Sequence, residues 1–124
     1  MTPTATVDTY LQGLETDWRR VADGEWGLTV ESAGWPLHIG MAWRDGLLRA
    51  QAEVLSPGQV ADHELLFRNR SLVLVRYAHT GAGAVYVHGE LPPELVTPQW
   101  LDRLLGMLVD ASNVARERAR AVRA

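Results

Sequence analysis

The chain has 124 residues, of which 47% are hydrophobic and 22% are charged, and its formal net charge is −3 at pH 7. This length and composition favour one folded domain over residues 1–124 and exclude disorder as the dominant state. The absence of cysteine excludes disulfides, thiolate zinc sites and thiol nucleophiles. The sequence contains no apolar run long enough to span a bilayer and no secretory signal at its start, so we expect a cytoplasmic protein that does not bind membranes.

Residues 7–21 are expected to form the first helix. Their apolar residues recur at intervals of three and four, namely Val7, Tyr10, Leu11, Leu14, Trp18 and Val21. Thr4 or Thr6 can cap its start, and Gly24 is expected to end it in the left-handed conformation.

Residues 26–54 change to an alternating pattern that predicts three antiparallel strands, over residues 26–31, 37–43 and 47–54. A turn is expected at residues 33–36, and Asp45-Gly46 is a strong signal for a type I′ hairpin turn. Because apolar and polar residues alternate, one face of these strands should be buried and the other solvated.

The second half of the chain predicts a short helix, a hairpin and a long helix. The short helix should cover residues 59–70, with Val60, His63, Leu66 and Phe67 turned inwards, and strands should follow over residues 72–77 and 84–88. Thr97 and Pro98 mark the start of a long helix. Its predicted apolar face contains Leu101, Leu104, Leu105, Leu108, Ala111, Ser112 and Ala115, whereas residues 116–124 are expected to project or fray.

The predicted fold class is therefore α+β. We expect a single antiparallel sheet of about five strands with helices on one face, in the order α-βββ-α-ββ-α.

No constellation of residues predicts catalysis. The four histidines, His38, His63, His79 and His88, lack the spacing of a metal site, and Gly81-Ala82-Gly83 lacks the third glycine of a dinucleotide loop. Catalysis needs a base held against a reacting group with a supporting partner, and the sequence assembles none. We therefore expect no catalytic, cofactor-binding or metal-binding residues, and a protein that is not an enzyme.

Some aromatic and arginine residues are candidates for contacts with a partner. Trp35 lies in a Gly-Trp-Pro turn and is the best candidate for an exposed aromatic anchor, with Trp26 on the other side of the same hairpin. Arg116 and Arg120 belong to the arginine-rich end of the last helix. These arginines either form a solvated face at the negative end of the helix dipole or contact an acidic or phosphate-bearing partner.

The order of elements and three short motifs resemble a known family. The motifs are Glu-Leu-Leu-Phe-Arg-Asn at residues 64–69, Gly-Glu-Leu-Pro at 89–92, and Thr-Pro-Gln-Trp-Leu at 97–101. Together they resemble the YbjN family, whose fold is similar to that of type III secretion chaperones. The resemblance implies a non-enzymatic domain, commonly a homodimer, with roles in stress responses and regulation. Chaperones of this fold bind extended segments of other proteins along hydrophobic patches and sheet edges.

The functional hypothesis is a dimeric protein-binding module whose partner the sequence does not identify. The dimer contact is expected within residues 59–77, where leucine, valine and phenylalanine are abundant, and the candidate residues are Leu66, Phe67, Leu72, Leu74 and Tyr77. The alternative is a nucleic-acid accessory factor that uses the arginine-rich C-terminal helix. The net charge of −3 argues against direct binding of nucleic acid.

Overall fold

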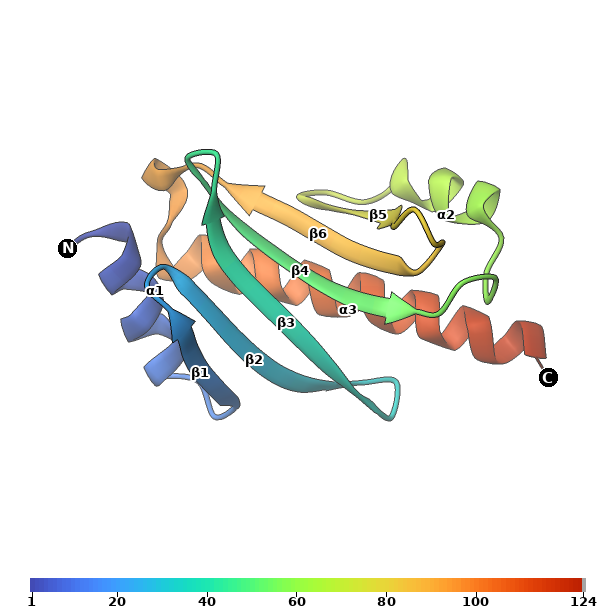
Figure 1. The fold of residues 1–124 in the computed structure, drawn as a ribbon, viewed down its shortest axis with the longest axis horizontal. Coiled ribbons are helices and arrows are strands. Elements are labelled where there is room, and N and C mark those ends of the chain that lie inside the picture. The colour runs from blue at the N-terminus through green and yellow to red at the C-terminus, as the bar shows by residue number, and fades with distance from the viewer. Residues whose placement is uncertain (124) are drawn as a thin grey trace.

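The computed structural model describes residues 1–123 as an α+β fold built on one antiparallel sheet (Figure 1). The sheet has six strands in the order β1-β2-β3-β4-β6-β5, where about five were expected. In chain order the elements are α1 (Pro3–Gln12), β1 (Asp17–Ala22), β2 (Glu25–Ser32), β3 (Trp35–Arg44), β4 (Leu47–Leu55), α2 (Asp62–Asn69), β5 (Val75–His79), β6 (Val85–Leu91), a 3-10 turn (Pro93–Leu95) and α3 (Pro98–Arg123). Figure 1 shows α3 running along one face of the twisted sheet, with the two termini at opposite ends of the molecule.

The extra strand comes from the segment predicted to be the end of the first helix. Helix α1 ends at Gln12, and Trp18 and Val21 lie on β1, which pairs with β2. The turn between these strands contains Gly24, whose φ of +68° lies in the left-handed region. The helical spacing at Trp18 and Val21 was therefore misleading, because inter-strand pairing decides the conformation of so short a segment. The cap was also wrong, since the Oγ1 atom of Thr2 accepts the bond from the backbone of Ala5.

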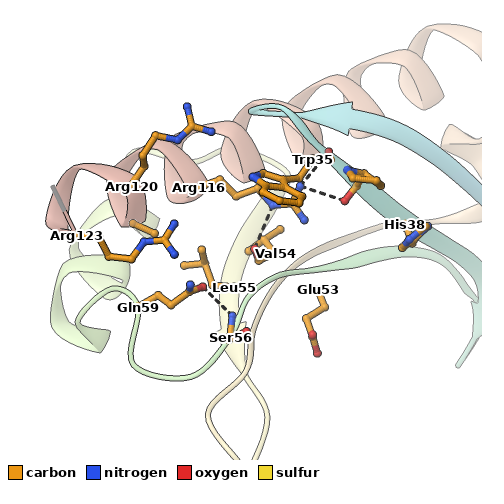
Figure 2. Close-up of a pocket in the computed structure, with 12 residues that line it drawn as sticks. Trp35, His38, Glu53, Val54, Leu55, Ser56, Gln59, Arg116, Arg120 and Arg123 are labelled. Carbon is orange, nitrogen blue, oxygen red and sulfur yellow. Dashed lines mark hydrogen bonds between the residues drawn. The ribbon is translucent and has the colours of Figure 1, made fainter.

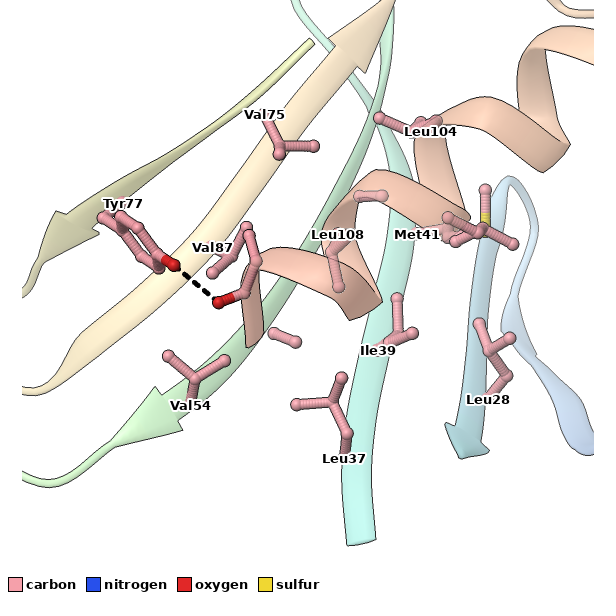
Figure 3. Packing of buried hydrophobic residues seen from close by; sticks show 14 of the residues in the cluster. Leu28, Leu37, Ile39, Met41, Val54, Val75, Tyr77, Val87, Leu104 and Leu108 are labelled. Atoms are coloured by element: carbon pink, nitrogen blue, oxygen red, sulfur yellow. Dashed lines mark hydrogen bonds between the residues drawn. The ribbon is translucent and has the colours of Figure 1, made fainter. Parts of the chain in front are cut away.

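The hydrophobic core lies between the sheet and α3 (Figure 3). The predicted apolar face of this helix is confirmed and extends one turn further, its buried residues being Leu101, Leu104, Leu105, Leu108, Ala111, Ser112, Ala115 and Ala119. Ala119 is buried and the helix continues to Arg123, so α3 remains packed against the fold beyond residue 116. Residue 124 lies outside the described residues.

Two tight turns set the shape of the central hairpins. Asp45 and Gly46 both have positive φ angles, of 54° and 77°, as the predicted type I′ turn requires. Ala33 and Gly34 adopt the same pattern, with φ angles of 52° and 86°. The β2–β3 turn delivers Trp35 to the first position of β3, beside the C-terminal part of α3.

Helix α2 is shorter than predicted and presents a different face. Leu65 is its buried residue, whereas Leu66 and Phe67, which were expected to point inwards, are each 66% exposed. The helix contacts the edge strand β5 and lies beside the sheet, so it can bury only a narrow stripe. The following strand begins at Val75, which leaves Leu72 and Leu74 in the connection.

Among residues 1–123, none of the helices combines the length and the hydropathy needed to cross a membrane.

Candidate protein-binding surfaces

Three of the four predicted partner-contacting residues meet in one hollow. Trp35, Arg116 and Arg120 line a cavity of about 560 Å³ between the β2–β3 hairpin, the end of β4 and the C-terminal part of α3 (Figure 2). We call it the Trp35 pocket. Its remaining lining residues are Pro36, His38, Glu53, Val54, Leu55, Ser56, Gln59, Ala119 and Arg123.

The guanidinium of Arg116 fixes α3 to the strands at the base of this pocket. Its Nε atom donates to the carbonyl of Val54 at 3.1 Å, which lies at the end of β4. Its Nη1 atom donates to the carbonyls of Ser32, Trp35 and Pro36 at 3.1, 3.3 and 3.2 Å. Partial burial lowers the pKa of Arg116, because a low-dielectric environment disfavours its charged form. Arg116 is thus mainly a positioning residue for the Trp35 pocket.

Trp35 and the two arginines beyond Arg116 form the accessible part of the pocket. The Trp35 side chain is 66% exposed. Arg120 donates from Nη2 to the carbonyl of Ala33 in the β2–β3 turn. Arg123 belongs to the same arginine-rich end of the helix but was not singled out from the sequence. It lies three residues beyond Arg120 on the same face of α3, so the spacing of Arg116, Arg120 and Arg123 could have identified it.

Trp26 does not belong to this surface. Its side chain is only 1% exposed, and its Nε1 atom donates to Oδ1 of Asp8 at 2.8 Å. The prediction that Trp26 contacts a partner is wrong, because the indole is enclosed in the core and its Nε1–H group is already hydrogen-bonded.

A second surface is formed by exposed apolar side chains at α2. We define the α2 patch as Leu66, Phe67 and Val73, which are 66%, 66% and 65% exposed. Of the five residues proposed for a dimer contact, only Leu66 and Phe67 are exposed, and Leu72 and Leu74 are partly buried against the core.

The fifth residue, Tyr77, faces the interior. It is 4% exposed, and its hydroxyl donates to the backbone carbonyl of Ala111 at 2.6 Å (Figure 3). This side chain supports α3 and cannot also contact a second subunit, which corrects that part of the prediction.

The two edges of the sheet differ in whether the backbone N–H and C=O groups of the edge strand already have hydrogen-bond partners. At β5 the side-chain amide of Asn69 accepts from the backbone nitrogen of Tyr77 at 2.7 Å and donates to its carbonyl at 3.0 Å. This amide occupies the positions that an added strand would use. At the other edge β1 pairs with β2 only as far as Thr29, so within residues 1–123 the end of β2 beyond Thr29 has no strand partner on that side.

An acidic groove lies next to this free end of β2. It has a volume of about 400 Å³ between α1, α3 and the strands, and its apolar floor includes Leu28, Val30 and Ile39. The carboxyl-bearing residues that line it are Glu15, Asp102 and Asp110. The hydroxyl of Tyr10 donates to Asp102, and burial followed by this bond raises the pKa of Tyr10.

The four histidines are not brought together. His38, His63, His79 and His88 lie on β3, α2, β5 and β6, and no group of three or more potential metal ligands occurs among residues 1–123. Burial lowers the pKa of His88, and the nearby charges of Arg76 and Arg49 lower it further, whereas Glu90 opposes them.

Comparisons with known proteins find likeness at the level of the fold. The sequence matches no family model, and a search of curated proteins finds no match. The fold is similar to a chain of the HopA1–SchA chaperone–effector complex, with a TM-score of 0.71, 13% identity and coverage of 91% of both chains.

Two other solved structures share the fold at similar levels. One is the heterodimeric ExoU–SpcU complex from the type III secretion system of Pseudomonas aeruginosa, with a TM-score of 0.64, 17% identity and coverage of 90% of this chain and 96% of that one. The other is the Yersinia pestis type III secretion chaperone SycH in complex with a fragment of YscM2, with a TM-score of 0.66, 18% identity and coverage of 92% and 99%. The chain therefore has the fold of type III secretion chaperones.

Proposed function

We propose that this chain is a non-enzymatic, chaperone-like module that binds a partner protein through the Trp35 pocket. The observation that carries the proposal is an aromatic side chain left 66% exposed at the rim of a 560 Å³ hollow whose base is fixed by Arg116. Exposed aromatic anchors beside arginine are typical of sites that dominate protein–protein binding. The likeness of the fold to chaperones solved with protein partners supports the same class of function.

The finer parts of the proposal follow from the family resemblance. Residues 64–69 and 89–92 support membership of the YbjN family and, with it, a cytoplasmic role in a stress response. The partner itself has to be found by experiment, because fold alone does not identify a ligand.

Replacing Trp35 with alanine tests the proposed function. A tagged wild-type protein should capture a specific protein from nuclease-treated lysate, and the purified partner should then bind Trp35→Ala at least about tenfold more weakly, as expected for an aromatic hot spot. Binding constants measured by calorimetry give the comparison. Val21→Ala is the matched control, because Val21 is also exposed but lies on β1.

Equal affinity of wild type and Trp35→Ala would reject the Trp35 pocket as the binding site. Oligonucleotides that bind at near-physiological salt would instead favour the nucleic-acid alternative. Two observations argue against that alternative: Arg118 forms an ion pair with Glu64 at 2.8 Å, and the formal net charge of the chain is −3.

We propose further that the α2 patch joins two copies of the chain. Leu66 and Phe67 form an apolar surface on a helix held against α3 by the pair between Arg118 and Glu64. An exposed apolar patch can be buried against the same patch of a second copy across a twofold axis. Such a dimer would place one Trp35 pocket on each subunit.

Phe67→Arg is expected to convert the dimer to a monomer. The change puts a charge into an apolar contact and leaves the fold intact, since the Phe67 side chain is two-thirds exposed. Multi-angle light scattering measures the mass. Val21→Arg is the control, because it also replaces an exposed apolar residue with arginine but lies on β1, away from the α2 patch. An unchanged mass for Phe67→Arg, or a monomeric wild type, would refute the proposed contact.

A further inference from the structure

The Trp35 pocket gathers arginines that form no ion pair with a carboxylate among residues 1–123. Arg116, Arg120 and Arg123 all line it, and within residues 1–123 none of them lies within 4.0 Å of a carboxylate oxygen. The neighbouring Arg118, on another face of α3, is paired with Glu64 at 2.8 Å. The pocket thus gathers three unpaired guanidinium groups in a chain whose formal net charge is −3.

The groups that do contact these arginines are neutral. Arg116 donates to four backbone carbonyls and Arg120 to one, so their hydrogen-bonding capacity is partly used while their charge remains. Glu53 is the acidic residue of the lining, and Figure 2 shows its side chain extending away from the guanidinium groups. Arg120 and Arg123 are exposed, so an anion that enters the pocket can accept charge-assisted hydrogen bonds from their guanidinium groups.

The rest of the lining combines apolar surface with the polar side chains of His38, Glu53, Ser56 and Gln59. The Trp35 indole stands at its rim, and Pro36, Val54 and Leu55 contribute further hydrocarbon surface. The occupant that matches this lining carries an anionic group next to an apolar side chain. A volume of about 560 Å³ has room for two or three side chains of a bound segment.

We propose that the Trp35 pocket binds an acidic segment of the partner protein, with a glutamate or aspartate carboxylate on Arg120 and Arg123 and a neighbouring apolar side chain on Trp35. This inference rests on the proposed function and adds the chemistry of the partner. A planar carboxylate can accept two parallel bonds from a guanidinium fork.

A carboxylate segment fits the surroundings of the pocket better than a nucleic acid does. Before the C-terminal helix the chain is acidic, with 12 carboxyl-bearing residues and 7 arginines in residues 1–97. An extended polyphosphate would meet this negative surface on leaving the pocket, whereas one or two carboxylates interact only with the local arginines.

The charges along α3 also suggest an orientation for the segment. Asp102 and Asp110 line the acidic groove along the first half of the helix, and Arg120 and Arg123 line the Trp35 pocket near its end. We therefore expect the acidic residues of the partner segment to be confined to the end that lies in the Trp35 pocket. Acidic residues at its other end would be repelled by Asp102 and Asp110.

Peptide titrations followed by NMR test this inference without the natural partner. The probes are a short peptide of alternating glutamate and leucine, the same peptide with glutamine for glutamate, and the same peptide with lysine. The indole N–H signal of Trp35 is identified by its loss in Trp35→Phe. The glutamate peptide is expected to shift this signal and to bind at least about tenfold more tightly than the glutamine peptide, with an affinity that falls as salt rises.

Arg123→Glu is the decisive variant, because Arg123 makes no hydrogen bond or ion pair among the described residues and its replacement leaves the anchor at Arg116 in place. It should weaken binding of the glutamate peptide at least about tenfold and should bind the lysine peptide better than wild type does. The matched control is Arg103→Glu, which makes the same charge change on α3 at a residue that does not line the pocket.

Two results of the peptide titrations would overturn the inference: equal binding of the three peptides, or no movement of the Trp35 signal by any of them at millimolar concentration. Equal effects of Arg123→Glu and Arg103→Glu on peptide binding would also overturn it. So would a thymidine oligonucleotide that shifts the Trp35 signal as strongly as the glutamate peptide does. These outcomes are separate from failure of the proposed function. A natural partner that needs Trp35 but is indifferent to Arg123→Glu would keep the protein-binding function and remove the acidic segment. A partner indifferent to Trp35 would reject the functional proposal whatever the peptides do.

Discussion

Gly89→Ala is expected to lower the free energy of unfolding by about 3 kcal/mol, because the added methyl group has no space. Gly89 lies on β6, and a Cβ atom there would be 2.3 Å from the backbone carbonyl oxygen of Leu74 and 3.0 Å from a methyl group of Leu104. The Leu104 side chain can move, but the carbonyl belongs to a residue with a φ of +73° whose backbone is already in the left-handed region. Relief would require the connection before β5 to shift.

Urea denaturation measures this effect, and Gly40→Ala is the matched control. Gly40 lies on β3 of the same sheet, and no other side chain or strand comes within 4 Å of the position that its Cβ atom would take, so its replacement should be neutral or slightly stabilising. If both alanine variants unfold at the same urea concentration, the close approach at Gly89 is not what limits the site.

The long helix was the part of the fold that the sequence defined best. Its apolar residues repeat with helical spacing over several turns, and Thr97 and Pro98 mark its start. The Oγ1 atom of Thr97 accepts a bond from the backbone of Trp100, as the capping pattern predicts. The Asp45-Gly46 turn was equally clear, because few residues other than these tolerate two consecutive positive φ angles.

Short segments at the margins of the sheet were harder to predict. Trp18 and Val21 continue the spacing of α1, yet they lie on β1, whose conformation depends on pairing with residues further along the chain. The prediction of which face of α2 is buried was wrong for a related reason. Leu65, Leu66 and Phe67 are consecutive apolar residues, and only the position of β5 decides which of them is buried.

The candidate site was predictable in its residue types and not in its assembly. A Gly-Trp-Pro turn favours an exposed Trp35, but Trp35 and Arg116 are 81 residues apart in the sequence. They meet because α3 stays docked as far as the β2–β3 turn. Trp26 shows the converse, since its proximity to Trp35 in the sequence gave no indication that its side chain is enclosed beside Asp8.

The docking of α3 at the Trp35 pocket is stabilised by small side chains together with one long one. Ala111, Ala115 and Ala119 are all buried, which allows the helix backbone to approach the strands closely. Arg116 then reaches backbone carbonyls at the ends of β2, β3 and β4. The geometry of the pocket therefore depends on Arg116 more than on any other side chain in its lining.

Arg116→Met is accordingly expected to lower the free energy of unfolding by about 2 kcal/mol and to weaken partner binding as well. Methionine keeps much of the hydrocarbon length but leaves the carbonyls of Ser32, Trp35, Pro36 and Val54 without the guanidinium, so both the helix end and the Trp35 turn lose a constraint. Urea denaturation gives the stability, and the NMR line width of the Trp35 indole reports on its mobility.

Arg103→Met serves as the control, because Arg103 lies over the ring of Trp100 on the same helix and makes no hydrogen bond to a strand carbonyl among the described residues. Its stability should stay within about 0.5 kcal/mol of the wild type. If Arg116→Met is as stable as Arg103→Met and its Trp35 signal is unchanged, the four carbonyl bonds do not hold the pocket together. A loss of stability at Arg116 alone, with increased mobility of Trp35, would show that one partly buried cation on α3 sets the shape of the surface proposed to bind the partner.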